Sequence, residues 1–431
     1  MSAELRWMND LPNGWGVRRL AYLGEFLKGR GIARENITDD GVPAILYGDI
    51  YTQYDVKTDR LVKFTTAEVA EGSEPIQYGD LLLTGSGETK EDIGKCVAYL
   101  GKERAYAGGD VIILRQDQVD SLFLSYVLNS APSVAQKTQM GKGEIIVHIY
   151  SSDLRNLVFA LPPLTTQRRI ASYLNEETAR IDALVKAKQE MLALLEKKRA
   201  ALVSQAVTKG LDLKVQMKDS GIEWLGEIPE HWEVRRFKFL TTERLMYGAN
   251  EAAEEIEPTW PRYVRITDVT EQGTLRDETF RSLAPEIAAP YLLQEGDILF
   301  ARSGATVGKS FRYQQQWGVA CFAGYLIRMR CDLEQVSPEY VELFTTTPAY
   351  WAQVGAGTIQ ATIPNFSAEK YGDVVMPLPS LKEQRAIVKR VAHEGEPLKR
   401  MEAAITESIG FLARRRAALI TAAVTGRMNI N

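Results

Sequence analysis

The chain has 431 residues, of which 45% are hydrophobic and 25% are charged, as in a globular protein with more than one domain. The formal net charge is −4, so any nucleic-acid binding must depend on local features rather than on a bulk excess of basic residues. Cys96, Cys321 and Cys331 have neither paired nor CxxC spacing, which predicts no disulfide framework or zinc site and suits the cytoplasm. The first ten residues lack the apolar core of a signal peptide, and the longest near-apolar run, residues 318–327, is too short for a membrane helix.

The sequence contains an internal repeat, with an offset of 217 positions between Trp15 and Trp232. Four segment pairs share this offset: LPNGWGVRRL (11–20) with IPEHWEVRRF (228–237), YGDLLLTGSG (78–87) with EGDILFARSG (295–304), LPPLTTQRRI (161–170) with LPSLKEQRAI (378–387), and RAALVSQAVT (199–208) with RAALITAAVT (416–425). The chain is therefore a tandem duplication.

The first part of each copy, residues 1–163 and 228–380, contains short β-rich runs separated by turn signals. One helical stretch is expected in each, near residues 120–137 and 337–352. This mixture predicts two similar α/β globules within an α+β fold.

The second part of each copy, residues 164–210 and 381–427, has apolar residues every seven positions, which is typical of a coiled coil. Each helix would be roughly 60 Å long, and the two would pack antiparallel to bury their seams. Leu184, Met191 and Met401 are expected to support those seams. Residues 211–227 form a connector, and Gly395 and Pro397 predict a kink or short break in the second helix.

The stretch ARSGATVGKS (301–310) is close to a phosphate-binding loop. That loop requires four residues between its glycines, whereas Gly304 and Gly308 enclose three. The matching stretch in copy one, TGSGETKEDIGKC (84–96), differs in length, and the residues after Ser310 read as a strand rather than a helix. We expect a β-hairpin tip, and a variable tip between persistent strands is typical of a recognition loop.

Catalytic patterns are missing from the sequence. His148, His231 and His393 are scattered, and no Cys/His/Asp grouping has metal or nucleophile spacing. IPNF (363–366) lacks the second proline of the amino-methyltransferase motif and is interpreted as structural.

The order of these segments resembles the specificity subunit of type I restriction-modification systems over nearly the whole chain. The most specific elements are the two LP-x-L-x-x-QR-x-I helix starts, at Leu161 and Leu378, and the connector SGIEWLGEIPEHW. Thr166 departs from the glutamate usual in the family, which stands here at Glu383.

The resemblance implies that each globule is a target-recognition domain for one half of a split double-stranded DNA site, and that the helices set the spacer. It also implies two modification subunits that carry S-adenosylmethionine and methylate adenine, and two restriction subunits that use ATP and Mg²⁺. This chain would itself be non-catalytic, hold no cofactor and contact no membrane.

Duplex DNA has local two-fold symmetry, so two related domains can meet equivalent groove faces about one turn, ~34 Å, apart. Predicted DNA contacts are Ser86, Lys90 and Lys142 in copy one, and Arg265, Arg302, Lys309 and Gln360 in copy two. Of these, Arg302 and Gln360 could make bidentate base contacts. Gln167, Arg168, Gln384 and Arg385 recur at both helix starts, where they could either brace globule to helix or meet a partner subunit.

Two other functions compete with DNA recognition. One is a duplicated coiled-coil scaffold that binds proteins or small ligands, and the other is an ATP-hydrolysing enzyme. Stoichiometric ATP binding that Lys309→Ala abolishes would favour the second.

Overall fold

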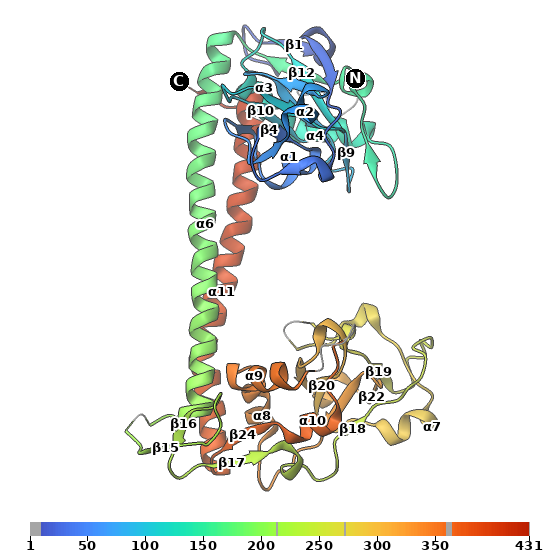
Figure 1. Cartoon of the computed structure of the whole chain (residues 1–431), viewed down its shortest axis with the longest axis vertical. Helices are drawn as coiled ribbons and strands as arrows, with labels where there is room; N and C mark the ends of the chain where they lie inside the picture. Colours follow the sequence, from blue (N-terminus) through green and yellow to red (C-terminus); the bar gives the residue numbers. More distant parts are fainter. Residues whose placement is uncertain (1–9, 213, 271–272, 359–363, 431) are drawn as a thin grey trace. The chain divides into compact units, whose positions relative to one another are not determined.

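The structure is a computed structural model that describes residues 10–212, 214–270, 273–358 and 364–430. It divides into two compact units: unit 1 comprises Met1–Gln189 and Thr406–Asn431, and unit 2 comprises Glu190–Ile405. Two long helices, α6 (Leu164–Lys209) and α11 (Leu381–Val424), cross this division (Figure 1). Each unit therefore holds one globule of the repeat and a segment of both long helices.

Unit 1 is built on two five-stranded sheets, ordered β2-β12-β8-β10-β5 and β3-β6-β4-β11-β7, with two small pairs, β1-β14 and β9-β13. The strands of the first sheet are β2 (Glu25–Lys28), β5 (Lys57–Thr58), β8 (Leu81–Thr84), β10 (Cys96–Tyr99) and β12 (Val111–Arg115). Those of the second are β3 (Ile37–Thr38), β4 (Val42–Ile45), β6 (Lys63–Thr65), β7 (Glu74–Ile76) and β11 (Ala105–Ala107). The pairs use β1 (Gly16–Arg19), β9 (Ser86–Gly87), β13 (Val147–His148) and β14 (Val158–Leu161), and the helices are α1 (Tyr47–Thr52), α2 (Ala67–Glu71), α3 (Ser121–Asn129), α4 (Ala131–Met140) and α5 (Ser151–Leu154).

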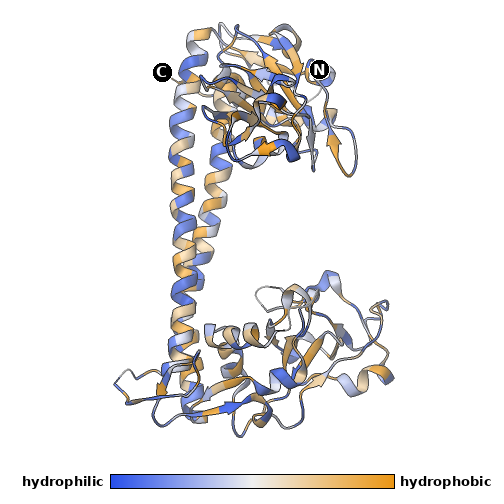
Figure 2. Ribbon diagram, in the orientation of Figure 1, coloured by the Kyte–Doolittle hydropathy of each residue, from blue (hydrophilic) through white to orange (hydrophobic). Residues whose placement is uncertain are grey.

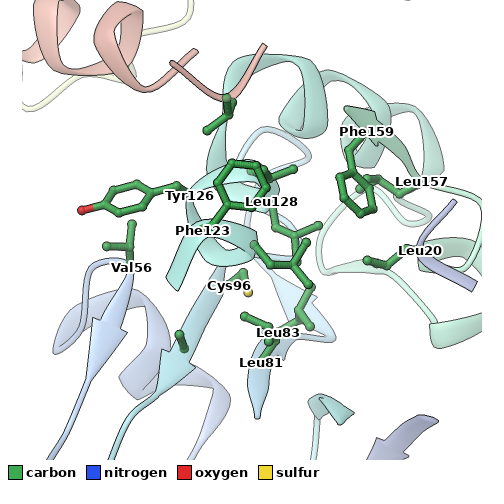
Figure 3. Close-up of a cluster of buried hydrophobic side chains, with 14 of the residues drawn as sticks. Leu20, Val56, Leu81, Leu83, Cys96, Phe123, Tyr126, Leu128, Leu157 and Phe159 are labelled. Atoms are coloured by element: carbon green, nitrogen blue, oxygen red, sulfur yellow. The ribbon is translucent and has the colours of Figure 1, made fainter. Parts of the chain in front are cut away.

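The main core of unit 1 lies between the first sheet, α3 and the long helices. Phe123, Tyr126 and Leu128 of α3 pack on Leu81, Leu83 and Cys96 of the sheet (Figure 3). The cluster also takes in Ile170 and Leu174 of α6 and Ile420, Ala423 and Val424 of α11. The end of the chain therefore completes the core of the N-terminal globule.

Unit 2 contains a four-stranded sheet, β18-β23-β20-β21, and three two-stranded pairs, β19-β22, β17-β24 and β15-β16. Its strands are β15 (Met217–Asp219), β16 (Glu227–Pro229), β17 (Glu233–Arg236), β18 (Met246–Tyr247), β19 (Arg262–Val264), β20 (Ile298–Ala301), β21 (Ser310–Arg312), β22 (Ala320–Phe322), β23 (Leu326–Met329) and β24 (Val375–Leu378). Its shorter helices are α7 (Pro285–Ala288), α8 (Pro338–Phe344), α9 (Pro348–Gly357) and α10 (Ala368–Asp373).

The core of unit 2 is built like that of unit 1, but it contains the end of α6 and the start of α11 instead of the start of α6 and the end of α11. Phe344 of α8 and Phe300 of β20 share a cluster with Val203, Ala206 and Val207 of α6 and with Ile387 and Val391 of α11. The start of one helix lies with the end of the other in each unit, so the helices run antiparallel there. The predicted α+β class with antiparallel long helices is confirmed.

Each long helix ends at a glycine against a tryptophan. After α6, Gly210 has φ +77°, and a Cβ added there would lie 3.2 Å from the ring of Trp232. After α11, Gly426 has φ +74°, and an added Cβ would lie 2.6 Å from Pro12 and 3.6 Å from Trp15. Glycine ends a helix in this left-handed conformation without strain, and its missing side chain lets the ring approach.

In each unit, an ion pair with a buried carboxylate explains the aspartate of the repeated YGD and EGD segments. Asp80 accepts two hydrogen bonds from Arg115, at 2.7 and 3.0 Å. Asp297 accepts two from Arg330, at 2.8 and 2.9 Å. Both carboxylates also accept a backbone N–H from the preceding turn, so each is compensated for its burial.

Two local predictions need correction. The expected single helical stretch of each globule is two helices, because Pro132 and Pro348 occupy the first turn of α4 and α9 and end the preceding helix. The expected short break at Gly395 and Pro397 is wrong, since α11 runs unbroken with Pro397 inside it. Buried Val391 and Leu398 anchor the helix on either side of that point.

The seam prediction is also wrong for three side chains. Leu184, Met191 and Met401 are exposed rather than packed. Apolar and polar residues alternate along both long helices in Figure 2, and the buried positions include Leu174, Ile181, Leu398, Ile405 and Leu412.

Candidate nucleic-acid interface

The glycine-rich stretch of unit 2 is the connection of a β-hairpin, as predicted. β20 pairs antiparallel with β21, and Phe300 lies opposite Ser310. Gly304 and Gly308 have φ +76° and +87°, and a single 3-10 turn, Gly304–Thr306, lies between the strands. No α-helix follows this loop.

Several of its backbone N–H groups already have protein acceptors. Gly304 donates to the carbonyl of Pro364 at 3.1 Å, Val307 to Gly304 at 3.2 Å and Lys309 to Thr306 at 2.9 Å. A phosphate-binding loop needs such groups to be free for oxygen atoms of the nucleotide. The geometry therefore does not support an ATP site here.

Two buried tyrosines form hydrogen bonds with the backbone of this loop. The Tyr371 hydroxyl donates to the carbonyl of Ala301 at 2.7 Å and accepts the N–H of Gly308 at 3.0 Å. The Tyr350 hydroxyl donates to the carbonyl of Gly308 at 2.8 Å. Burial raises the pKa of both phenols, which keeps them protonated as donors.

A second segment lies against this loop. Ser303 forms a β-bridge with Asn365, and Phe366 donates its N–H to the carbonyl of Arg302 at 2.8 Å. Residues 302–309 and 364–366 thus form one structure, which we call the composite loop of unit 2.

Unit 1 contains the same arrangement. β9 pairs with β13, so that Ser86 lies opposite His148, and the Ser86 hydroxyl and His148 Nδ1 are 2.9 Å apart. Ser86 and Ser303 are 217 positions apart, as are His148 and Asn365. Residues 85–95 and 141–148 form the composite loop of unit 1.

A buried lysine fixes the C-terminal end of the segment 85–95 in the unit 1 loop. Lys137 of α4 donates from Nζ to the carbonyl of Gly94 at 2.6 Å. Burial lowers the pKa of Lys137 to about 8, and the nearby thiol of Cys96 opposes that shift. Tyr51 holds the other side of the loop through Thr84, with 2.7 Å between the two hydroxyl oxygens.

In unit 1, two of the three predicted DNA contacts are exposed. Lys90 lies in the loop between β9 and β10, and Lys142 lies at the base of the 141–148 hairpin, 3.2 Å from Asp153. Ser86 is 3% exposed and bonded to His148, so a direct DNA contact by its side chain is not supported.

In unit 2, Lys309 is exposed on the composite loop. Arg302 is half-buried, with its guanidinium 4.8 Å from the ring centroid of Tyr247. Arg265 is bonded to Asp268 at 2.7 and 3.0 Å and to the carbonyl of Thr279, so its donors serve the fold rather than an open surface. Gln360 lies outside the described residues.

The glutamines at the helix starts brace globule to helix. Gln167 accepts the N–H of Asp120 at 2.9 Å and donates to the carbonyl of Pro162 at 2.8 Å. Gln384 accepts the N–H of Ser337 at 2.8 Å and donates to the carbonyls of Gln335 and Pro379. Arg168 and Arg385 are exposed, which leaves them open to a partner.

The sequence reasoning missed the pairing of His148 and Asn365 with the two serines. Sequence spacing gives His148 no metal-ligand or nucleophile grouping and gives IPNF (363–366) no complete methyltransferase motif, so neither segment is predicted to pair with a loop. The shared offset of 217 was the signal that could have joined them.

Comparisons with known proteins agree with this architecture. Residues 12–193 match the family model described as type I restriction modification DNA specificity domain. The MjaVIII specificity subunit of Methanocaldococcus jannaschii is 23% identical over 88% of this chain and 86% of its own length. The EcoKI specificity subunit of Escherichia coli is 24% identical over 88% of this chain and 82% of its own length. The first copy of the repeat therefore contains a type I restriction-modification DNA specificity domain, and most of the chain is similar to specificity subunits of such systems.

Solved structures share the fold of this chain. A chain from a type I R-M complex has a TM-score of 0.73 at 16% identity and covers 97% of this chain and 99% of its own. The HsdS subunit from Thermoanaerobacter tengcongensis has a TM-score of 0.50 at 18% identity, over 97% and 98% of the two chains.

Within residues 10–212, 214–270, 273–358 and 364–430, no cluster of three His, Cys, Asp or Glu is placed to hold a metal. In that same part of the chain, no helix is both long and apolar enough to cross a membrane.

Proposed function

We propose that this specificity subunit recognises an asymmetric, bipartite double-stranded DNA site, one half read by the globule of each unit. The observation that carries the proposal is the repetition of the composite loop at an offset of 217 with different side chains. A shared frame with different side chains is what two unlike half-sites require.

The exposed cations fit a positioning role on the phosphate backbone. Lys90 and Lys142 belong to the composite loop of unit 1, and Lys309 to that of unit 2. Arg302 and Gln360 stay our predicted base contacts in the second half-site. A chain with a net charge of −4 needs further phosphate contacts, which we assign to partner subunits.

Exposed apolar side chains on the long helices support two equivalent partners. Leu184 and Met401 are 52% and 45% exposed, and Leu194 and Phe411 are 64% and 57% exposed. Both pairs have the repeat offset of 217. We assign these positions to two modification subunits that carry S-adenosylmethionine and methylate adenine. Two restriction subunits would add ATP- and Mg²⁺-dependent cleavage, all within the cytoplasm.

The test is to purify the chain with its modification subunits and to map methylated adenines on genomic DNA. We expect one split site with two unlike halves. Exchanging residues 1–160 for those of a relative should change one half and leave the other intact.

Methylation without a split site, or a change in both halves after the exchange, would contradict the proposal. DNA-independent binding of another protein or small ligand as the sole activity would favour the scaffold alternative.

A further inference from the structure

The hairpin of residues 141–148 in unit 1 has a fixed turn. Lys142 and His148 exchange backbone hydrogen bonds of 2.9 and 2.7 Å at its base. Gly143 has φ +111°, and an added Cβ would lie 2.1 Å from the carbonyl oxygen of Ile146. Only glycine permits this turn without a clash.

Two branched aliphatic side chains occupy that tip. Ile145 is 89% exposed and Ile146 is 57% exposed. They follow Gly143 and the exposed Glu144, and β13 begins at the next residue, Val147. A β-branched side chain has few rotamers to lose, so it can bind without a large entropic cost.

The base of the hairpin connects this tip to the glycine-rich part of the composite loop. β13 pairs with β9, and His148 is bonded to Ser86. The hairpin projects beside β9 in Figure 1. The two isoleucines are therefore part of the surface to which we assign DNA recognition. They are flanked there by the exposed Glu144 and by Lys142, which is paired with Asp153 at 3.2 Å.

We propose that Ile145 and Ile146 identify A·T pairs in the first half-site by packing on thymine methyl groups in the major groove. This inference rests on the proposed function. The thymine methyl is the apolar group exposed in that groove, and hydrophobic side chains read it by contact. Two side chains form too small a patch for a stable protein interface, which favours a contact within a larger polar DNA interface.

The experiment measures binding of the full chain with its modification subunits to its mapped site. Each thymine of the first half-site is replaced in turn by deoxyuridine, which removes only the methyl group. We expect at least one replacement to raise the Kd about fourfold, the equivalent of about 0.8 kcal/mol for one buried methyl group.

Ile145→Ala and Ile146→Ala should each reduce this discrimination between thymine and deoxyuridine, with unchanged melting temperature. The control is Val62→Ala, because Val62 is 56% exposed on the same unit but outside the composite loop. It should keep the full fourfold effect. Deoxyuridine in the second half-site should give the same result with all four proteins.

Equal binding of thymine and deoxyuridine throughout the first half-site would overturn the inference. So would discrimination that both isoleucine variants retain, or variants whose only defect is weaker assembly with the modification subunits. These results leave the split site itself intact, whereas failure of the proposed function would show as the absence of that site.

Discussion

Gln167 and Gln384 lose their hydration when they are buried at the starts of the long helices, and each recovers hydrogen bonds from backbone groups. An amide is suited to this position because it can donate and accept at once. The repeat indicated that these residues mattered, but it could not distinguish a brace from a partner contact, because burial depends on residues 120 and 337, far away in the sequence. The same reason explains Ser86, whose loop sequence gives no sign of its burial.

Gln384→Ala should destabilise unit 2 by about 1–3 kcal/mol, because the backbone N–H of Ser337 would lose its acceptor while staying buried. Thermal unfolding followed by circular dichroism measures the shift. Arg385→Ala is the matched control, because that side chain is exposed and should change stability little. Equal effects of both substitutions would contradict the brace.

Lys137 should make the stability of unit 1 increase with pH between about 8 and 10.5. Its pKa is lowered from 10.5 to about 8 by burial, so between these values the unfolded chain holds one proton more than the folded chain. Stability therefore rises with pH across this window, by up to about 3 kcal/mol, and the penalty is fully present below pH 8.

The measurement compares melting temperatures of the wild type and Lys137→Met at pH 7.5 and 9.5. Wild type should gain stability relative to the variant as the pH rises, and the exposed Lys90→Met should show no such difference. A difference in melting temperature between wild type and Lys137→Met that stays constant with pH would show that burial does not lower the pKa of Lys137.

At the scale of elements, apolar patterns predict the strands and the long helices, and the structure buries most of the apolar residues that form these patterns. Apolar runs such as LLLT and ILFA form central strands, β8 and β20. The effect of proline differs from the prediction in both directions. It divided two predicted helical stretches at Pro132 and Pro348, where it occupies a first turn, yet Pro397 is held inside α11 by buried neighbours. Helix propensity alone does not include the tertiary packing that keeps Pro397 within the helix. The kink expected near Pro397 stays a prediction.

Pro397→Ala should stabilise unit 2 by about 1–3 kcal/mol, because it restores a helix hydrogen bond and removes a clash with the carbonyl four residues back. Pro397 is exposed, so no packing is lost. Urea unfolding checks this. Arg180→Ala, at the equivalent position of α6, should have little effect, and a destabilised Pro397→Ala would show that the proline geometry is needed.

At the scale of the whole molecule, the repeat offset was enough to predict duplication, antiparallel helices and two globules. It did not show that the compact units divide the helices between them, or that each globule is completed by the last turns of the other copy's helix. That arrangement depends on which helix end packs against which globule after folding. The apolar pattern of the long helices cannot show this, because the same pattern would suit more than one way of packing the helices.

Val424→Ala and Val207→Ala test this exchange of helix ends. They are equivalent positions, but Val424 packs in the core of unit 1 and Val207 in that of unit 2. Each should cost about 2 kcal/mol by creating a cavity. Hydrogen-exchange mass spectrometry should show lost protection in β8 and β12 for Val424→Ala, and in β20 and β23 for Val207→Ala. The opposite pattern would disprove the assignment.

Because Ile420, Ala423 and Val424 belong to the core around Phe123, the part of the protein synthesised first is the last to be finished. While the ribosome is still adding the second copy, the nascent first globule keeps an apolar surface open to water. A truncation before Ile420 would thus damage the first globule, although the missing residues belong to the second copy, and until those residues are translated the open surface is a natural client for chaperones.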